Sequence, residues 1–299
     1  MTPPPAAVTR VGPAVLQLVA AGWALSCLDA SGKWAMEAGA SLLLLCWVRY
    51  VMHLLVSVAV VWRVEGLQRL RSVNPAPQWL RAGFMLASTL SFYATLRLLP
   101  QAESTAIVFL APLLVLLLAP LLLRERPQLR RWLAAAGGFA GVLVIIRPGA
   151  GLHGTGTALG LLTAFLFAGQ FIANRLVARD HPLTTLVWGG AIGSLVFTLA
   201  LPWYWEPALA QWQQMGPWPR VVLLSTGLWG ALGHLLQISA YRNAPASLLA
   251  PFTYLQIVAA TTLGWLVWRQ FPDALTWLGI GLVIASGVGI MLRELRGVR

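Results

Sequence analysis

Residues 94–147 read ATLRLLPQAESTAIVFLAPLLVLLLAPLLLRERPQLRRWLAAAGGFAGVLVIIR, and residues 239–292 read SAYRNAPASLLAPFTYLQIVAATTLGWLVWRQFPDALTWLGIGLVIASGVGIML. At a constant offset of 145 the two stretches align without a gap and are identical at eleven positions. Leucine matches arise by chance in apolar sequence. The informative pairs are polar or helix-ending residues: Arg97 and Arg242, Pro100 and Pro245, Arg124 and Arg269, Pro127 and Pro272, Trp132 and Trp277. These pairs indicate an internal repeat.

The composition around this repeat is that of a membrane protein. Of the 299 residues, 58% are hydrophobic and 10% charged, against about 45–50% and about 25% in soluble domains. This excludes a soluble globular enzyme. Apolar runs bounded by charge, proline or glycine predict ten membrane spans: 14–36, 42–62, 79–99, 102–123, 130–146, 155–178, 182–202, 220–243, 246–268 and 274–292. Because a bilayer cannot solvate free backbone groups, we expect an all-α integral membrane protein with ten transmembrane helices.

The repeat divides the ten spans into two halves, residues 1–150 and 151–299, with five helices each. An odd number of spans per half inverts the second half relative to the first. Inverted repeats are typical of transporters, which bind substrate near the bilayer midplane between the halves. We therefore expect the two halves to form one transport unit.

The net charge of +12 reflects arginines scattered at span ends, which suits lipid headgroups and not nucleic acid. With the N-terminus inside, fifteen of the 21 Lys and Arg residues lie on one side and six on the other. An excess of Lys and Arg in short loops marks the cytoplasmic side of the membrane. We expect a multi-pass protein of the cell's inner membrane with both termini cytoplasmic. The tryptophan-rich segment 203–219 suits a loop at the headgroups on the other side.

The helix-ending and proline pattern, with Pro100, Pro112, Glu125 and Trp132, resembles the drug/metabolite transporter superfamily of the EamA type over essentially the whole chain. Gln270 stands where the second half would repeat Glu125, so Glu125 receives no transport role. The resemblance implies alternating access, and within the superfamily the chain looks most like exporters of aromatic amino acids, partly because it has fifteen tryptophans. The expected function is export of small amphiphilic solutes, either aromatic amino acids, other metabolites or hydrophobic cations.

Asp29 and Lys33 lie four residues apart in the first span, on one helix face. They form either a structural ion pair near the outer end of the span or a gate or proton-coupling site, because intramembrane charges are costly and usually functional. Arg175 falls opposite Lys33 when the opening spans of the two halves are aligned. The three residues are the gating or coupling candidates.

Two groups of residues are candidates for substrate binding. The resemblance implies a core lining of Ser88, Tyr93, Phe109, His234, Gln237, Tyr241, Tyr254 and Gln256, in which Phe109 and Tyr254 are repeat equivalents. His234, Gln237 and Tyr241 share one helix face, which turns either to a cavity or to a packed neighbour. Polar or aromatic pairs one turn apart add Trp23, Ser26, Gln170 and Asn174.

Enzyme motifs are missing from the sequence, which has no GxSxG, HExxH or P-loop pattern and no paired carboxylates within a span. An integral membrane lipid-modifying enzyme remains the alternative from another class, and a channel is disfavoured because no ring of like charge recurs. No His, Cys or acid stands at ligand spacing near His234, so we expect no metal and no cofactor. The expected partners are a small-molecule substrate and membrane lipid, with a monomer as the expected state.

Overall fold

The computed structural model describes residues 11–111, 113–115, 118, 129–147, 153–177, 179–243 and 252–297. In these ranges the chain is helical, as expected, with ten α-helices and one short 3-10 helix. Their bounds are α1 Val11–Glu37, α2 Leu42–Val64, η1 Leu67–Leu70, α3 Pro75–Leu96, α4 Gln101–Val108, α6 Leu129–Ile146, α7 Gly154–Leu176, α8 Pro182–Gln214, α9 Pro217–Asn243, α11 Gln256–Trp268 and α12 Ala274–Gly297. Four of them, α1, α2, α7 and α8, are each long and apolar enough to cross a bilayer.

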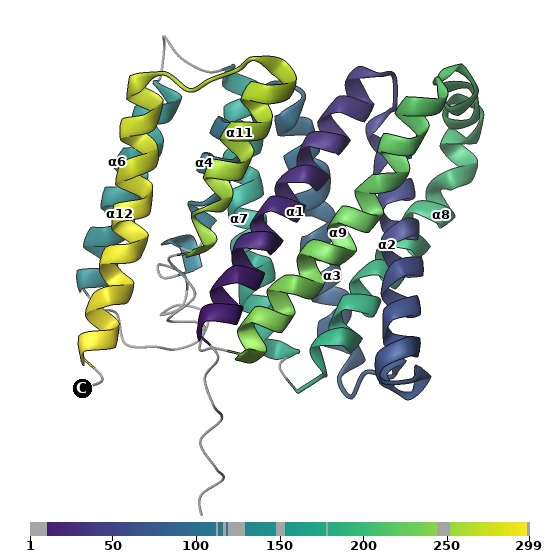
Figure 1. The fold of residues 1–299 in the computed structure, drawn as a ribbon, viewed down its shortest axis with the longest axis horizontal. Helices are drawn as coiled ribbons and strands as arrows, with labels where there is room; N and C mark the ends of the chain where they lie inside the picture. The colour runs from purple at the N-terminus through teal and green to yellow at the C-terminus, as the bar shows by residue number, and fades with distance from the viewer. Residues whose placement is uncertain are drawn as a thin grey trace, which may run out of the picture.

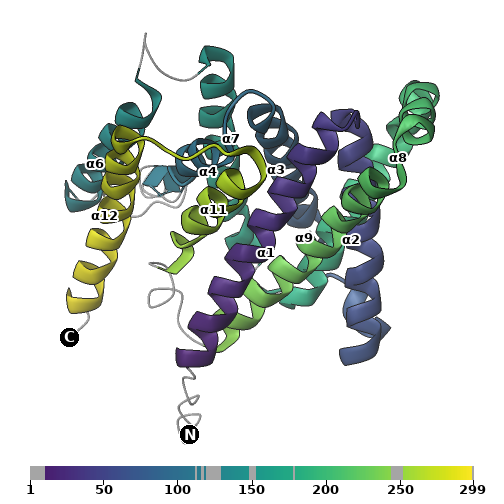
Figure 2. The ribbon, with the colours of Figure 1, turned by 45° about the horizontal axis from the view of Figure 1, so that its top comes forward.

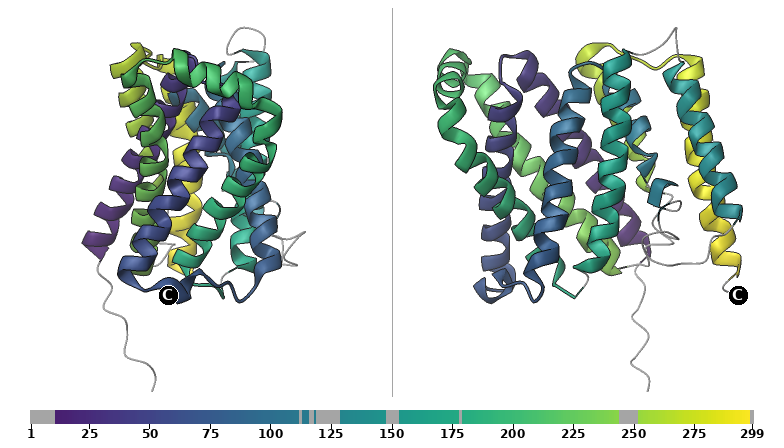
Figure 3. Two further views of the ribbon diagram at one scale, coloured as in Figure 1. Left: turned by 90° about the vertical axis from the view of Figure 1, so that its right-hand side faces the viewer. Right: turned by 180° about the vertical axis from the view of Figure 1, so that it is seen from behind.

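The helices form two layers related by the repeat (Figure 1). One layer holds α12, α11, α1 and α9, and the layer behind it holds α6, α4, α7 and α3, as the view from behind also shows (Figure 3). The main contacts follow the same symmetry: α1 packs on α9 as α7 packs on α3, while α6 packs on its own equivalent α12 and α2 on α8. The inverted five-helix repeat is therefore visible in the packing.

Charged residues lie at both ends of the bundle. The upper end of Figure 1 holds Glu37 at the end of α1, Arg147 after α6 and Asp273 before α12. The lower end holds the segment after η1 and the turn between α7 and α8, with Arg71 and Asp180. Helix α1 begins and α12 ends at the lower end (Figures 1 and 2).

The expected headgroup loop at 203–219 is wrong, because α8 continues through Gln214. Pro202 and Pro207 lie inside this helix and each removes a backbone donor. The hydroxyl of Tyr204 donates to the carbonyl of Phe197 at 2.8 Å, which supports the helix next to Pro202. Trp203 is 84% exposed, so the aromatic residues line an extension of the helix where a loop was expected.

The fourth and ninth spans are interrupted at equivalent positions. Helix α4 ends at Val108 and the chain turns at Phe109, while α11 begins at Gln256 after a turn at Tyr254. The sequence has a proline at 112, which cannot donate to the carbonyl of residue 108, so a helix ends there readily. The repeat equivalents Phe109 and Tyr254 thus lie at helix breaks, and their ring centroids are 5.2 Å apart.

Glycines allow the closest helix contacts. A Cβ on Gly227 of α9 would lie 2.7 Å from the backbone nitrogen of His53 in α2. A Cβ on Gly279 of α12 would lie 2.6 Å from the carbonyl oxygen of Gly141 in α6. Small residues at such positions let helix backbones approach closely within a membrane.

Candidate substrate site

Helix α1 contacts both interrupted helices through Ser26. The Ser26 carbonyl accepts a hydrogen bond of 2.9 Å from the side-chain nitrogen of Gln101 at the start of α4. The Ser26 hydroxyl donates to the backbone carbonyl of Gln256 at the start of α11, at 3.4 Å. A small crevice of about 10 Å³ beside this contact is lined in part by Gly22, Gln237 and Gln256 and has room for about one water molecule. The polar atoms of α1, α4 and α11 therefore meet in the interior of the bundle.

Tyr93 of α3 packs against α1 one turn beyond Ser26. Its ring is fully buried, and its hydroxyl donates to the carbonyl of Leu28 at 3.4 Å. A Cβ on Gly32 would lie only 2.3 Å from this ring. Glycine at 32 is thus what lets the backbone of α1 rest against the Tyr93 ring.

Asp29 on α1 and Arg49 on α2 are charged side chains close enough to influence one another electrostatically. The guanidinium of Arg49, on α2, lies 5.4 Å from the Tyr93 ring centroid and 5.5 Å from that of Tyr50. It donates a hydrogen bond of 3.2 Å to the hydroxyl of Thr89. Asp29 is 9% exposed and is an electrostatic neighbour of Arg49. Among the described side chains, no direct ion pair of 4.0 Å or less joins the two.

Of the two alternatives for Asp29 and Lys33, the structural ion pair is not formed among the described side chains, and the gating or coupling role stays a prediction. The Lys33 ammonium donates instead to the backbone carbonyl of Leu99 at 3.0 Å, and it lies 5.0 Å from the Trp268 ring centroid. Carbonyls beyond the end of a helix such as α3 have no intrahelical partner and attract cations. The long lysine side chain reaches this acceptor on another element, although Asp29 lies on its own helix face.

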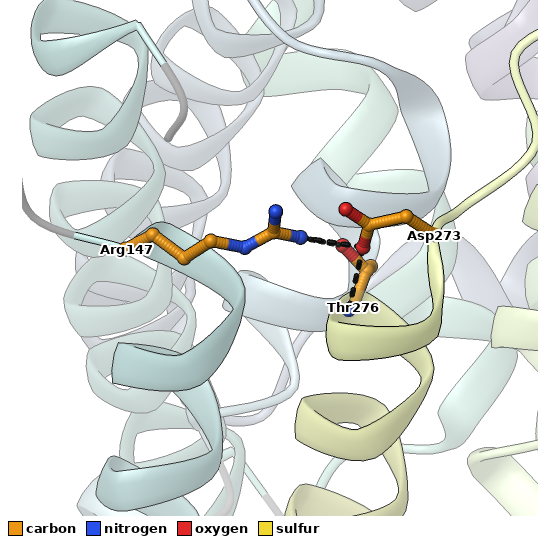
Figure 4. Close-up of polar contacts among 3 residues, drawn as sticks. All are labelled: Arg147, Asp273 and Thr276. Atoms are coloured by element: carbon orange, nitrogen blue, oxygen red, sulfur yellow. Dashed lines mark hydrogen bonds and ion pairs between the residues drawn. The ribbon is translucent and has the colours of Figure 1, made fainter. Parts of the chain in front are cut away.

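The upper end of the bundle carries further charged contacts. The Trp268 indole donates to the Glu37 carboxylate at 2.6 Å, so Lys33, Trp268 and Glu37 join α1 to α11. Arg147 binds Asp273 at 2.5 Å and the Thr276 hydroxyl at 3.0 Å, which joins the end of α6 to the start of α12 (Figure 4). The hydrogen bond from Arg147 holds the pKa of the Asp273 carboxyl well below its ordinary value.

A second set of polar contacts lies between α2, α3, α7 and α9. The Ser88 hydroxyl donates to the Met85 carbonyl at 2.9 Å and lies 3.5 Å from the Gln170 side-chain oxygen. The rings of His53 and His234 meet edge to face with centroids 5.8 Å apart. Asn174 accepts a hydrogen bond from Arg81. These polar faces are therefore largely occupied by helix packing.

Asp180 joins the two halves at the lower end. Its carboxylate accepts hydrogen bonds from the Ser72 hydroxyl at 2.5 Å, the Val73 backbone nitrogen at 2.6 Å and the Gln78 side chain at 2.8 Å. Burial raises the pKa of this carboxyl, but the hydrogen bonds together outweigh burial and hold the pKa below its ordinary value. The carboxylate therefore stays ionised, as an acceptor of these bonds, under ordinary conditions.

The structure brings together only part of the expected set. Ser26, Asp29 and Tyr93 lie in one region, Phe109 contacts Tyr254 nearby, and Ser88 meets Gln170 farther along α3. Trp23 is 40% exposed and stands apart from these contacts. The side chains of Tyr241 and Arg175 lie outside the described residues.

Sequence reasoning missed Arg49 and Gln101. The charge count places Arg49 among the six basic residues on the non-cytoplasmic side. It nevertheless lies seven residues inside the expected span 42–62. Its position within an apolar run was the available signal, because intramembrane charges mark functional sites by default. Gln101 had no such signal, since its contact with Ser26 joins residues 75 positions apart.

Comparison with known proteins adds the family context. The EamA-like transporter family matches residues 12–147 and again 154–292. A riboflavin transporter of Rhizobium johnstonii is 28% identical over 95% of this chain and 92% of its own length. A pseudopaline exporter of Pseudomonas aeruginosa is 30% identical over 67% of this chain and 68% of its own. An S-adenosylmethionine uptake transporter of Rickettsia bellii is 26% identical over 77% of each chain.

A solved crystal structure shares the fold, with a TM-score of 0.60 and 20% identity over 95% of this chain and 99% of the other. The double family match agrees with the repeat read from the sequence. The relatives named above are transporters of three different metabolites, and the nearer resemblance to aromatic amino acid exporters finds no support among them.

Proposed function

Because the chain belongs to the EamA-like transporter family, and is thus a membrane transporter of small metabolites and not an enzyme, we propose that it exports small amphiphilic solutes by alternating access. The favoured substrates carry an aromatic ring together with opposite charges, as aromatic amino acids do. Other metabolites and hydrophobic cations are the alternative substrates.

The observation that carries this proposal is that Asp29 and Arg49, two intramembrane charges of opposite sign, influence one another without forming an ion pair in the described part of the chain. An arginine has five N–H donors, and the one hydrogen-bond acceptor found for Arg49 among the described side chains is Thr89. Two neighbouring charges of opposite sign that are not paired with each other can bind the ammonium and the carboxylate of one zwitterion. The neighbouring rings of Tyr93, Phe109 and Tyr254 supply apolar surface for the remainder of the solute.

Lys33 has the position of a gate in this proposal. Its bond to the Leu99 carbonyl connects α1 to the chain before α4 above the site, so releasing it would open a route to the upper end. Arg175 is the candidate for the equivalent role at the lower end, by its place in the repeat. Asp29 is the carboxyl that would carry a coupling proton if export uses one.

The lower end faces the cytoplasm in this proposal, because it collects the excess of basic residues. Trp218, which is 66% exposed near the start of α9 at the upper end, should then be outside. With Cys27 and Cys46 replaced, a cysteine at 218 should react with an impermeant maleimide added to intact cells. Protection of that cysteine in cells, with labelling only after lysis, would reverse the orientation.

Transport in proteoliposomes tests the substrate class. Tyr254→Ala should weaken tryptophan binding by about 1 kcal/mol, roughly fivefold in the half-saturating concentration, because an aromatic contact is lost. The same change should weaken leucine binding less, because leucine has no aromatic ring. Phe171→Ala is the matched control, since this exposed ring stacks on Phe167 away from the site.

The same assay separates the alternatives when tryptophan, leucine and riboflavin are compared with and without a pH gradient. Transport of riboflavin alone would favour an uncharged flat solute, like that named for the Rhizobium relative. If Tyr254→Ala weakened the binding of tryptophan and leucine equally, the aromatic ring of the substrate would not be recognised by Tyr254. Efflux that ignores the gradient would remove the coupling role of Asp29.

A further inference from the structure

An apolar groove lies on the flank of the bundle near its lower end. It has a volume of about 330 Å³ and is lined by Leu70 of η1, Trp79 of α3, and Val187, Trp188, Ile192 and Leu195 of α8. Trp79 and Leu195 are 49% and 46% exposed, so the groove opens at the surface of the bundle. An apolar cavity of about 150 Å³ is already enough to hold a molecule the size of benzene. The groove can therefore take a stretch of hydrocarbon chain.

The surroundings of the groove are basic and aromatic. Arg71 directly follows Leu70 and is exposed. Arg63, at the end of α2, is also exposed, with its guanidinium 5.6 Å from the Trp62 ring centroid. Tryptophans mark the depth of lipid headgroups, and exposed basic residues beside a membrane attract anionic ones. A charged headgroup and an apolar chain would thus both find a matching surface at this place.

We propose that the groove binds an acyl chain of an anionic phospholipid, with the lipid phosphate at Arg71. A lipid of neutral net charge would fill the same apolar surface, but it would gain less from the basic residues. The groove is lined by residues of η1, α3 and α8, none of which is a candidate substrate-binding residue.

The lipid would stabilise the place where the two halves meet. The Trp188 indole donates to the Leu70 carbonyl at 2.9 Å, so one wall of the groove already holds η1 against α8. The next residues along the chain, Ser72 and Val73, are bound to Asp180 beyond α7. A chain packed between Trp79 and Trp188 would reinforce both contacts at once.

Tryptophan quenching by brominated lipids tests the proposal. The full-length protein is placed in phosphatidylcholine nanodiscs, and phosphatidylglycerol brominated on its acyl chains replaces the host lipid in steps. We expect part of the fluorescence to be quenched at low mole fractions of phosphatidylglycerol, whereas brominated phosphatidylcholine at the same fractions gives only gradual quenching. Arg71→Gln should raise the mole fraction for half-quenching of this early part about fivefold. Arg97→Gln, an exposed arginine near the upper end of α3, should leave it unchanged.

Two variants assign the early quenching to the groove. Trp79→Phe with Trp188→Phe should abolish it by removing the reporters. Ala191→Phe, which fills the groove from its α8 wall and keeps every tryptophan, should abolish it as well. Equal early quenching by the two brominated lipids, an unchanged Arg71→Gln curve, or early quenching that survives in Ala191→Phe would each overturn the proposal.

Discussion

The double variant Asp29→Asn with Arg49→Gln should melt close to the wild-type temperature and yet transport tryptophan at least about tenfold more slowly. Asp29 is buried and Arg49 half-buried, so removing one charge leaves the other without its neighbour of opposite sign inside the membrane, whereas removing both is closer to neutral. Each single variant should therefore be less stable than the double one. Transport should not recover, since hydrogen bonds to charged groups are worth about 1.5–3 kcal/mol, which is roughly 10- to 100-fold in affinity.

The melting temperature in detergent tests the expected stability. The initial transport rate in proteoliposomes tests the expected loss of transport. Thr89→Val is the control, because it removes the hydrogen-bond acceptor of Arg49 and leaves both charges in place. Its transport should fall far less than that of the double variant. Wild-type transport by the double variant would exclude the charged pair from substrate binding. Lys33→Ala should not be rescued by a change at Asp29, because Lys33 is bound to Leu99.

Gly227→Ala should strongly destabilise the protein. The added Cβ would lie 2.2 Å from the Cβ of Met52, 2.7 Å from the backbone nitrogen of His53 and 2.8 Å from the backbone carbon of Met52. Backbone atoms of a packed helix cannot rotate away, so α2 and α9 would have to separate. Overpacking typically costs about 1–3 kcal/mol, and this contact should lie at the upper end of that range or beyond it.

Gly83→Ala is the matched control for this prediction. It makes the same change in the middle of α3, where no atom of another element lies within 4 Å of the added Cβ. Replacing a helical glycine by alanine at an open position stabilises by about 0.5–1 kcal/mol. Melting temperatures in detergent should thus move in opposite directions, and equal shifts would show that α2 and α9 do not pack as described.

The fold followed from the sequence because long apolar runs in a bilayer have few alternatives to helices. The repeat is visible in Pro100, Pro245 and the residues around them, and the breaks at Phe109 and Tyr254 each lie three residues from a proline in the sequence. The expected span 182–202 ends at Pro202, whereas α8 continues through this proline to Gln214. Helix interiors in membranes tolerate proline when other groups satisfy the freed carbonyls.

The site was harder to predict, because its contacts join distant parts of the chain. Helical spacing relates Asp29 to Lys33, and the sequence offers no way to see that a carbonyl at Leu99 competes for the ammonium. Likewise, the partner of Arg49 across the interior depends on how α1, α2 and α3 pack. Spacing identifies which residues share a helix face, but only packing decides what that face meets.

The ion pair between Arg147 and Asp273 has a consequence for the energy balance of transport. The repeat offset of 145 places Leu292 opposite Arg147 and Gln128 opposite Asp273, and that combination cannot form an ion pair. In the proposed alternating-access cycle, this ion pair therefore has no equivalent at the other end of the bundle to replace it when the access state changes. A substrate would shift the balance between the two access states only if it binds them with different affinities.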